Sequence, residues 1–251
     1  MPIMDTDQSD KTGVKLTKNV IKVGIDPRVE EMMKKKGELF SKAWAMEPSF
    51  YRMMQMAGNM TMGFAYQCQK VFNDDVLMKR LEEEHFDVGI AEPMGTCGFG
   101  LFKLLNIRAT MAAVSTVHMD TVSAAIGEPV PPCYVPGVMS TVGDRMNILE
   151  KLKNIVGQFL GALFFRGVFD KETLELLAET SYVFTNSNPY LDYPRPMLHK
   201  TVPIGGIAVS TEPGKNKLSA KWDAILSERN RTVLVSFGSQ AKAIYMPHQY
   251  M

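Results

Sequence analysis

Glu92 is the residue of this sequence whose position most directly suggests chemistry. It follows the short apolar run VGIA, residues 88–91, and stands just before Pro93. Such a run predicts a buried parallel strand, and ligands gather where parallel strands end. A carboxylate at such a strand end commonly orients a histidine or a ligand. The alternative is an ordinary surface glutamate, which the sequence taken alone favours.

Four histidines are candidate partners for this carboxylate. His118 lies in a proline-rich segment with Asp120 two residues later, so both side chains are candidates to line a pocket. His85 precedes the predicted strand and therefore lies at its wrong end. The other two, His199 and His248, are expected to be exposed.

Methionines are crowded into one short segment, MMQMAGNMTM, which spans residues 53–62. Flexible thioethers fill irregular gaps in a core and also adapt to varied apolar ligands. The core face of a helix is the favoured interpretation. The alternative is the wall of a permissive apolar pocket, with Met53 and Met56 among its lining residues.

Motifs for metal or cofactor binding are weak. The three cysteines, Cys68, Cys97 and Cys133, are widely spaced and form no CxxC pair, so neither a disulfide framework nor a zinc site is predicted. The DTD triplet at 5–7 lacks a preceding apolar strand and is read as a solvated loop. The glycines of GTCGFG, residues 95–100, have the spacing of a tight turn rather than the dinucleotide fingerprint. No bound cofactor and no metal are expected.

The overall composition is that of a globular protein. The 251 residues include 28 Lys plus Arg and 27 Asp plus Glu, with 45% hydrophobic residues. This near-neutral balance argues against nucleic acid as a partner. No apolar run reaches the length of a transmembrane helix, and the polar start has no apolar core of a signal peptide.

The elements that must position these residues alternate between strand and helix, which indicates an α/β fold with a parallel sheet. Residues 116–143 are expected to form a long loop with little regular structure. The apolar stretch 155–165 is read first as a buried helix and second as a helix touching a membrane surface. Strands are expected at 14–25, 88–91, 108–115, 181–187, 201–209 and 232–239, and helices at 27–80, 95–106, 144–166 and 219–229.

Four stretches together resemble the UDP-glycosyltransferase family, in particular the animal UDP-glucuronosyltransferases in their nematode form. They are residues 86–107, 131–154, 181–209 and 232–239, among which PPCYVPGVMS followed by DRM is the most specific. The resemblance implies a Rossmann-like parallel sheet with helices on both faces, as the N-terminal half of a two-domain GT-B-like fold. It also implies metal-free, inverting transfer of a sugar from UDP-glucuronic acid to a hydroxyl of a small lipophilic acceptor.

The resemblance also assigns parts of the chain. Residues 1–13 are a polar segment, 14–209 the acceptor-binding domain, 210–231 a linker with a short helix, and 232–251 the first strand of a truncated donor-binding domain. Glu92 matches the carboxylate that orients the catalytic histidine, where many members have aspartate. Residues 115–139 match part of the acceptor pocket, with Met53, Met56, His118, Asp120, Tyr134 and Met139 as candidate contacts.

The catalytic histidine would lie before Met1 and the donor-binding segment after Met251, so the expectation is a truncated product, inactive alone. The alternative is a non-catalytic lipophile-binding or interaction protein that pairs with full-length relatives. The family further implies the lumen of the endoplasmic reticulum, membrane contact through 155–165, and oligomers with itself or relatives. Two sequons, at Asn59 and Asn230, give weak support for a lumenal location.

Overall fold

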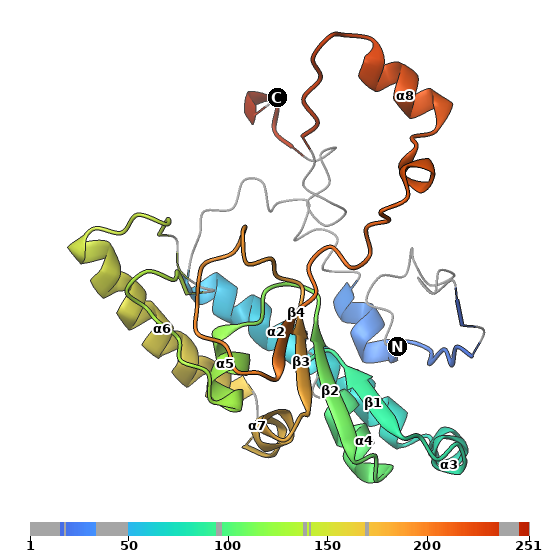
Figure 1. The fold of residues 1–251 in the computed structure, drawn as a ribbon. Helices are drawn as coiled ribbons and strands as arrows, with labels where there is room; N and C mark the ends of the chain where they lie inside the picture. Colours follow the sequence, from blue (N-terminus) through green and yellow to red (C-terminus); the bar gives the residue numbers. More distant parts are fainter. Residues whose placement is uncertain are drawn as a thin grey trace. The chain divides into compact units, whose positions relative to one another are not determined.

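A computed structural model describes residues 16–17, 19–33, 50–93, 97–137, 140, 142–168, 171–235 and 246–250 (Figure 1). At Met53 and Met56 only the backbone is described. The chain forms two units, one comprising Met1–Val29 with Ser49–Gly205 and the other Glu30–Pro48 with Gly206–Met251. Each unit is considered by itself.

The first unit contains a parallel sheet of four strands in the order β1-β2-β3-β4. The strands are β1 (Val88–Ala91), β2 (Ala109–Val114), β3 (Tyr182–Thr185) and β4 (Thr201–Pro203). The register pairs Ile90 with Met111 and Ala112 with Val183. The predicted strands at 88–91, 108–115 and 181–187 are therefore confirmed. The expected burial of 88–91 is wrong, because β1 is at the edge of the described sheet and leaves Val88 46% and Ile90 59% exposed. The strand predicted at 201–209 is shorter, because it ends at Pro203 and a turn with Gly206 at φ +85° follows.

Helices of the first unit connect these strands and cover the sheet (Figure 1). Phe99, Ala112, Val122, Leu177 and Val183 are buried members of one apolar core between the sheet and three of the helices. The predicted α/β fold with a parallel sheet is confirmed. The helices are α2 (Phe50–Phe72), α3 (Asp75–Glu83), α4 (Cys97–Leu104), α5 (Asp120–Ile126), α6 (Ile148–Val168) and α7 (Lys171–Ala178).

The strand predicted at 14–25 is wrong for the described residues, which have no strand at 16–17 and 19–26. Side chains of α2 satisfy this backbone instead of a neighbouring strand. Gln67 Nε2 donates to the Gly24 carbonyl at 3.0 Å, and Lys70 Nζ donates to the Ile25 carbonyl at 2.8 Å. Side chains of a helix, rather than a neighbouring strand, therefore bind the end of this segment.

The long irregular loop predicted at 116–143 is interrupted by helix α5. Val122 and Ile126, four residues apart, place their side chains in the core. The helix ends at Gly127, which adopts φ +85° and caps it in the left-handed conformation that glycine tolerates best. The proline signal that suggested a loop begins only at Pro129, after the helix has ended.

Helix α6 begins with a reciprocal cap. The Glu150 backbone N–H donates to Asn147 Oδ1 at 3.0 Å, and the Asn147 N–H donates to Glu150 Oε2 at 2.8 Å. The first interpretation of 155–165 as a buried helix is wrong, because Phe159 is 64% and Leu163 is 51% exposed. The helix turns the side chains of Asn154 and Gln158 toward the protein.

Asn154 is the side chain that fixes this orientation. It is fully buried and donates from Nδ2 to the carbonyls of Pro132 and Val135, both at 2.8 Å. Its Oδ1 accepts the Gly137 N–H at 2.9 Å. A Cβ at Gly137 would lie 2.7 Å from Gln158 Cγ, so only glycine permits this close approach. One helix residue thus holds the whole segment 132–137.

The second unit contains a short 3₁₀ helix at Pro213–Asn216, helix α8 (Ala220–Ser227) and a last 3₁₀ turn at His248–Tyr250. Helix α8 confirms the helix predicted at 219–229. The strand predicted at 232–239 is wrong at residues 232–235, which are exposed and form no strand. Its residues 236–239 lie outside the described part of the chain.

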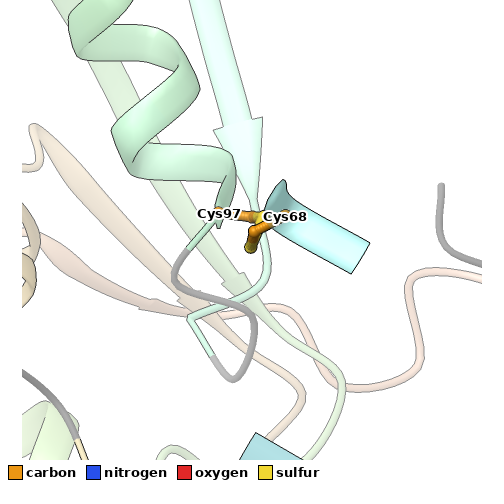
Figure 2. Close-up of a disulfide and its surroundings, with 2 residues drawn as sticks. All are labelled: Cys68 and Cys97. Carbon is orange, nitrogen blue, oxygen red and sulfur yellow. A yellow bond between two sulfur atoms is a disulfide. The ribbon is translucent and has the colours of Figure 1, made fainter. Parts of the chain in front are cut away.

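A disulfide joins Cys68 on α2 to Cys97 at the start of α4, with 5.5 Å between their Cα atoms (Figure 2). The prediction that the cysteines form no disulfide is therefore wrong. Their separation of 29 positions matches no short motif, and only the packing of α2 beside α4 brings them together. Cys133 is exposed and remains a thiol.

Replacing Cys68 and Cys97 by serine is expected to lower the free energy of unfolding by about 3 kcal/mol, since the unfolded chain loses its cross-link. Urea unfolding of the oxidised protein measures this loss, with Cys133→Ser as the control. Equal stability of the two variants would contradict a disulfide at this position.

Asn154→Leu is expected to lower the free energy of unfolding by about 2–4 kcal/mol, because it leaves buried backbone groups of the loop without partners. Hydrogen exchange should accelerate at 132–137 in the same variant. The neighbouring Lys153→Leu replaces an exposed residue, and its effect should stay within about 0.5 kcal/mol. Similar losses in both variants would show that Asn154 does not hold the loop.

Candidate functional site

Glu92 lies directly after β1, at the carboxyl end of the strand, as predicted. Its side chain is exposed and its Oε1 accepts a hydrogen bond of 2.6 Å from the Ser115 hydroxyl. The Ser115 backbone N–H donates to the same oxygen at 3.3 Å. Ser115 follows β2, so the ends of two adjacent strands meet at this carboxylate.

Asn186 extends this polar edge to the third strand. It follows β3, and its Nδ2 donates to the Ser115 carbonyl at 2.9 Å while its backbone N–H donates to the Val114 carbonyl at 3.1 Å. Glu92, Ser115 and Asn186 therefore form one exposed rim at the carboxyl ends of β1, β2 and β3. Sequence reasoning missed the last two, because the predicted strands 108–115 and 181–187 include them, whereas the observed strands end one residue before each.

His118 does not line an open pocket, contrary to the prediction. Its side chain is only 1% exposed, and Nε2 lies 2.8 Å from Glu128 Oε2. Its backbone N–H donates to Thr185 Oγ1 at 3.2 Å. The imidazole can be buried because Glu128 supplies a buried hydrogen-bond partner for it. Glu128 was not among the predicted site residues.

Glu128 is a buried carboxylate with three partners from distant segments. Besides His118, it accepts the Leu198 N–H at 2.8 Å and the Thr201 hydroxyl. Thr201 begins β4, whereas Glu128 follows α5, so this carboxylate ties the two elements together. A buried acidic group is tolerable only when it is hydrogen-bonded in this way.

Burial lowers the pKa of His118 from its ordinary value of 6.5, and the nearby Glu128 carboxylate opposes this shift without cancelling it. The ring is therefore neutral near pH 7. The Glu128 carboxylate can only accept a hydrogen bond from Nε2 of His118, so the hydrogen-bond network assigns the proton to that nitrogen. The other ring nitrogen, Nδ1, is buried and has no partner among the described residues.

The remaining candidate acceptor residues are not gathered around one described cavity. Asp120 is the first residue of α5, and Tyr134 is 43% exposed on the segment held by Asn154. Met139 lies outside the described residues, as do the side chains of Met53 and Met56. A cavity of about 280 Å³ lies at the other end of the sheet, where β2 begins. It is lined by Phe99, Lys103, Asn106, Ile107, Arg108, Thr110, Leu176 and Glu179.

The described residues contain no group of three His, Cys, Asp or Glu side chains that could hold a metal ion. The fold and the rim define an α/β protein of Rossmann-like type with an exposed carboxylate at the carboxyl edge of its sheet. A family model described as "UDP-glucoronosyl and UDP-glucosyl transferase" matches residues 4–247. The chain belongs to this family.

Curated relatives agree with the family model. A putative UDP-glucuronosyltransferase of Caenorhabditis elegans, ugt-56, is 29% identical over 72% of this chain and 36% of its own length. Human UDP-glucuronosyltransferase 1A3 is 25% identical over 78% of this chain and 39% of its own. A mouse 2-hydroxyacylsphingosine 1-beta-galactosyltransferase is 27% identical over 71% and 35%.

The chain thus spans well under half the length of these three relatives. No solved structure gives a significant match. The resemblance stated from the sequence is confirmed at the level of the family, and the relatives' differing names leave the sugar and the acceptor to be argued separately.

The lowered pKa of His118 predicts a pH dependence of stability with a definite sign. The unfolded chain binds a proton near pH 6.5 while the folded protein resists it, so stability should fall as pH drops below that value. His118→Gln keeps a donor but cannot titrate, and it should flatten this part of the profile. Urea unfolding at a series of pH values measures the effect. The range from about pH 5 to about pH 8 extends about 1.5 units to either side of the ordinary histidine pKa.

The matched control is His199→Gln, because His199 is exposed. This control should keep the slope of the unmodified protein. A slope that survives in His118→Gln but disappears in His199→Gln would overturn the assignment.

Proposed function

We propose that this chain is the acceptor-binding part of a UDP-glycosyltransferase that transfers glucuronic acid from UDP-glucuronic acid to a hydroxyl of a small lipophilic acceptor. The observation that carries the proposal is Glu92 at the carboxyl end of β1 in a chain of this family. The transfer inverts the sugar carbon, and UDP is the leaving group. The donor is a co-substrate, bound by the donor-binding part of the family.

Glu92 would act through a histidine rather than on the acceptor itself. The histidine takes the proton from the acceptor hydroxyl as its oxygen attacks the sugar carbon. The carboxylate holds the imidazole in the required tautomer and stabilises the cation that forms. The resemblance to the family places this histidine outside the four of this chain, and within the chain His118 is already engaged with Glu128.

Ser115 supports this role by fixing the carboxylate. Its hydroxyl and backbone N–H both donate to Oε1, which leaves Oε2 of Glu92 for the imidazole. Ser115 is itself held by Asn186 through its carbonyl. The rim therefore orients one carboxylate oxygen before any substrate is bound, which is the condition for efficient positioning.

The acceptor would lie against the methionine-rich segment 51–63 and the segment 115–139, with Met53, Met56, Tyr134 and Met139 as apolar contacts. Asp120 would give its polar edge. The lumen of the endoplasmic reticulum is the proposed compartment, since a disulfide such as Cys68–Cys97 persists where conditions are oxidising. Asn59 and Asn230 are exposed, as acceptors of N-linked glycans must be.

Glu92→Gln is expected to lower kcat about 10²–10⁴-fold in the enzyme form that carries this chain together with a donor-binding part. Glu92→Asp should retain much of the activity, since it keeps the charge. Transfer from UDP-glucuronic acid to a phenolic acceptor measures both, and thermal unfolding should be nearly unchanged because the side chain is exposed.

Asp87→Asn is the matched control, because Asp87 is exposed at the amino end of the same strand. It should keep full turnover. Full turnover in Glu92→Gln would make Glu92 an ordinary surface carboxylate. A form that binds the phenol but never transfers sugar would instead support the alternative of a lipophile-binding protein.

A further inference from the structure

The cavity of about 280 Å³ lies where β2 begins, at the end of the sheet opposite to Glu92. The six residues of β2 separate the two places by about 20 Å along the strand, at about 3.3 Å per residue. The volume is near the lower end of the range for small-molecule sites, which is about 300–1,000 Å³. Nothing in the role proposed for Glu92 uses this cavity.

The floor of the cavity is apolar and belongs to the core of the unit. Phe99 is 2% and Ile107 is 8% exposed, and the half-buried Leu176 packs against the core cluster. Core packing fixes these side chains, so the floor is formed without a ligand. An apolar group that covers this floor leaves water together with it, which favours binding.

Charged side chains surround the opening of the cavity. Lys103, Arg108 and Glu179 are all exposed, and none of them forms an ion pair with another described residue. The two cations and the one carboxylate leave one net positive charge at this place. A ligand with a single negative charge would neutralise it.

Uncharged hydrogen-bond donors lie beside these cations. Arg108 and Thr110 are two positions apart at the start of β2, so their side chains project to the same face of the sheet. The Thr110 hydroxyl and the Asn106 side-chain amide line the same cavity, and neither has a partner among the described residues. A carboxylate accepts hydrogen bonds from all these groups, and an arginine can bind it through two parallel hydrogen bonds.

The first wall of the cavity is a fixed turn between α4 and β2. Asn106 adopts φ +54°, the left-handed conformation in which an asparagine can end a helix. Its backbone N–H donates to the Lys103 carbonyl at 3.1 Å, and the Ile107 N–H donates to the Phe102 carbonyl at 2.9 Å. These two hydrogen bonds fix the direction in which the chain leaves α4. Lys103 and Arg108 are therefore held at the same opening.

The second wall of the cavity is the end of α7, at the same edge of the sheet (Figure 1). Lys200 Nζ donates to the carbonyls of Ala178 at 2.8 Å and Thr180 at 3.1 Å. The Ser181 N–H donates to the Thr110 carbonyl at 2.8 Å and joins this wall to the first. Free carbonyls at a helix end repel an anion, whereas these two are already bound to a cation.

An organic carboxylate fits this combination better than inorganic phosphate does. The apolar floor requires an apolar group on the ligand, which phosphate lacks. A phosphate dianion would also bring a second negative charge close to Glu179, where only one net positive charge is present to balance it.

We propose that this cavity binds a small amphipathic monocarboxylate. Lys103 and Arg108 hold its carboxylate. Asn106 and Thr110 add hydrogen bonds to the carboxylate, and the apolar body of the ligand covers the floor. Glu179 opposes anions of higher charge and so limits the site to monoanions. The site is independent of the function proposed above.

Titration of the isotope-labelled chain with 3-phenylpropionate, followed by amide NMR, tests the proposal. The amide signals of residues 103–110 and 176–181 should shift, with a dissociation constant of about 1 mM or lower for a ligand of this size. The amide 3-phenylpropionamide keeps the apolar body without the charge, and acetate keeps the charge without the body. Each of these should bind about tenfold more weakly or less.

Lys103→Gln combined with Arg108→Gln should weaken the binding of 3-phenylpropionate about tenfold, the scale of two exposed ion pairs. Glu179→Gln should strengthen it, because removal of this carboxylate leaves both cations unopposed. General damage to the cavity would weaken binding in all variants, so the opposite sign of the Glu179 effect identifies recognition of an anion.

The matched control is Lys79→Gln combined with Arg80→Gln, which removes the same two kinds of charge from exposed positions on α3. This control should bind 3-phenylpropionate as the unmodified chain does. Circular dichroism confirms that each variant is folded.

Four results would overturn the proposal. The absence of shifts at 103–110 and 176–181 would show that the cavity takes no such ligand. Equal binding of 3-phenylpropionamide, or unchanged binding after the loss of Lys103 and Arg108, would show that no anion is recognised. An equal loss in the α3 control would mean that the effect is one of overall charge. Tighter binding of inorganic phosphate than of 3-phenylpropionate would assign the two cations to free phosphate.

Discussion

The backbone of the proline-rich segment 132–137 lies against helix α6 and must find hydrogen-bond partners there, because prolines prevent it from forming regular structure. Asn154 supplies three of these hydrogen bonds from one buried amide. These hydrogen bonds to the loop determine which face of the 21-residue helix α6 is turned toward the protein. Glu128 plays the corresponding part at the other end of the segment, where it joins α5 to β4.

The sheet and the position of Glu92 were predictable because they depend on local patterns. Short apolar runs bounded by turns specify buried parallel strands, and the residue after such a run must lie at the edge of the sheet. The same reasoning places Ser115 and Asn186 on that edge once the strand order is known. Membership of the family followed from motifs that include PPCYVPGVMS, whose Gly137 the packing explains.

The features that escaped prediction depend on partners distant in the sequence. His118 was taken for a pocket residue because nothing local shows that Glu128 will bury it. The apolar run 155–165 predicts a buried helix, because composition gives no hint that Asn154 and Gln158 turn its apolar face outward. Cys68 and Cys97 pair only because two helices pack together. Residues 14–25 alternate like a strand, but Gln67 and Lys70 on α2 bind the carbonyls of Gly24 and Ile25 at its end.

The consecutive order of the four strands has a consequence for how the chain folds. The contact between Ser115 and Glu92 spans 23 positions, whereas that between Asn186 and Ser115 spans 71. During synthesis, the β1–α4–β2 unit is complete long before β3 leaves the ribosome, so β2 waits with one edge unpaired. An unpaired central strand is a template for pairing with other chains. The interval between the emergence of β2 and of β3 is therefore when the growing chain exposes an unpaired strand edge for longest.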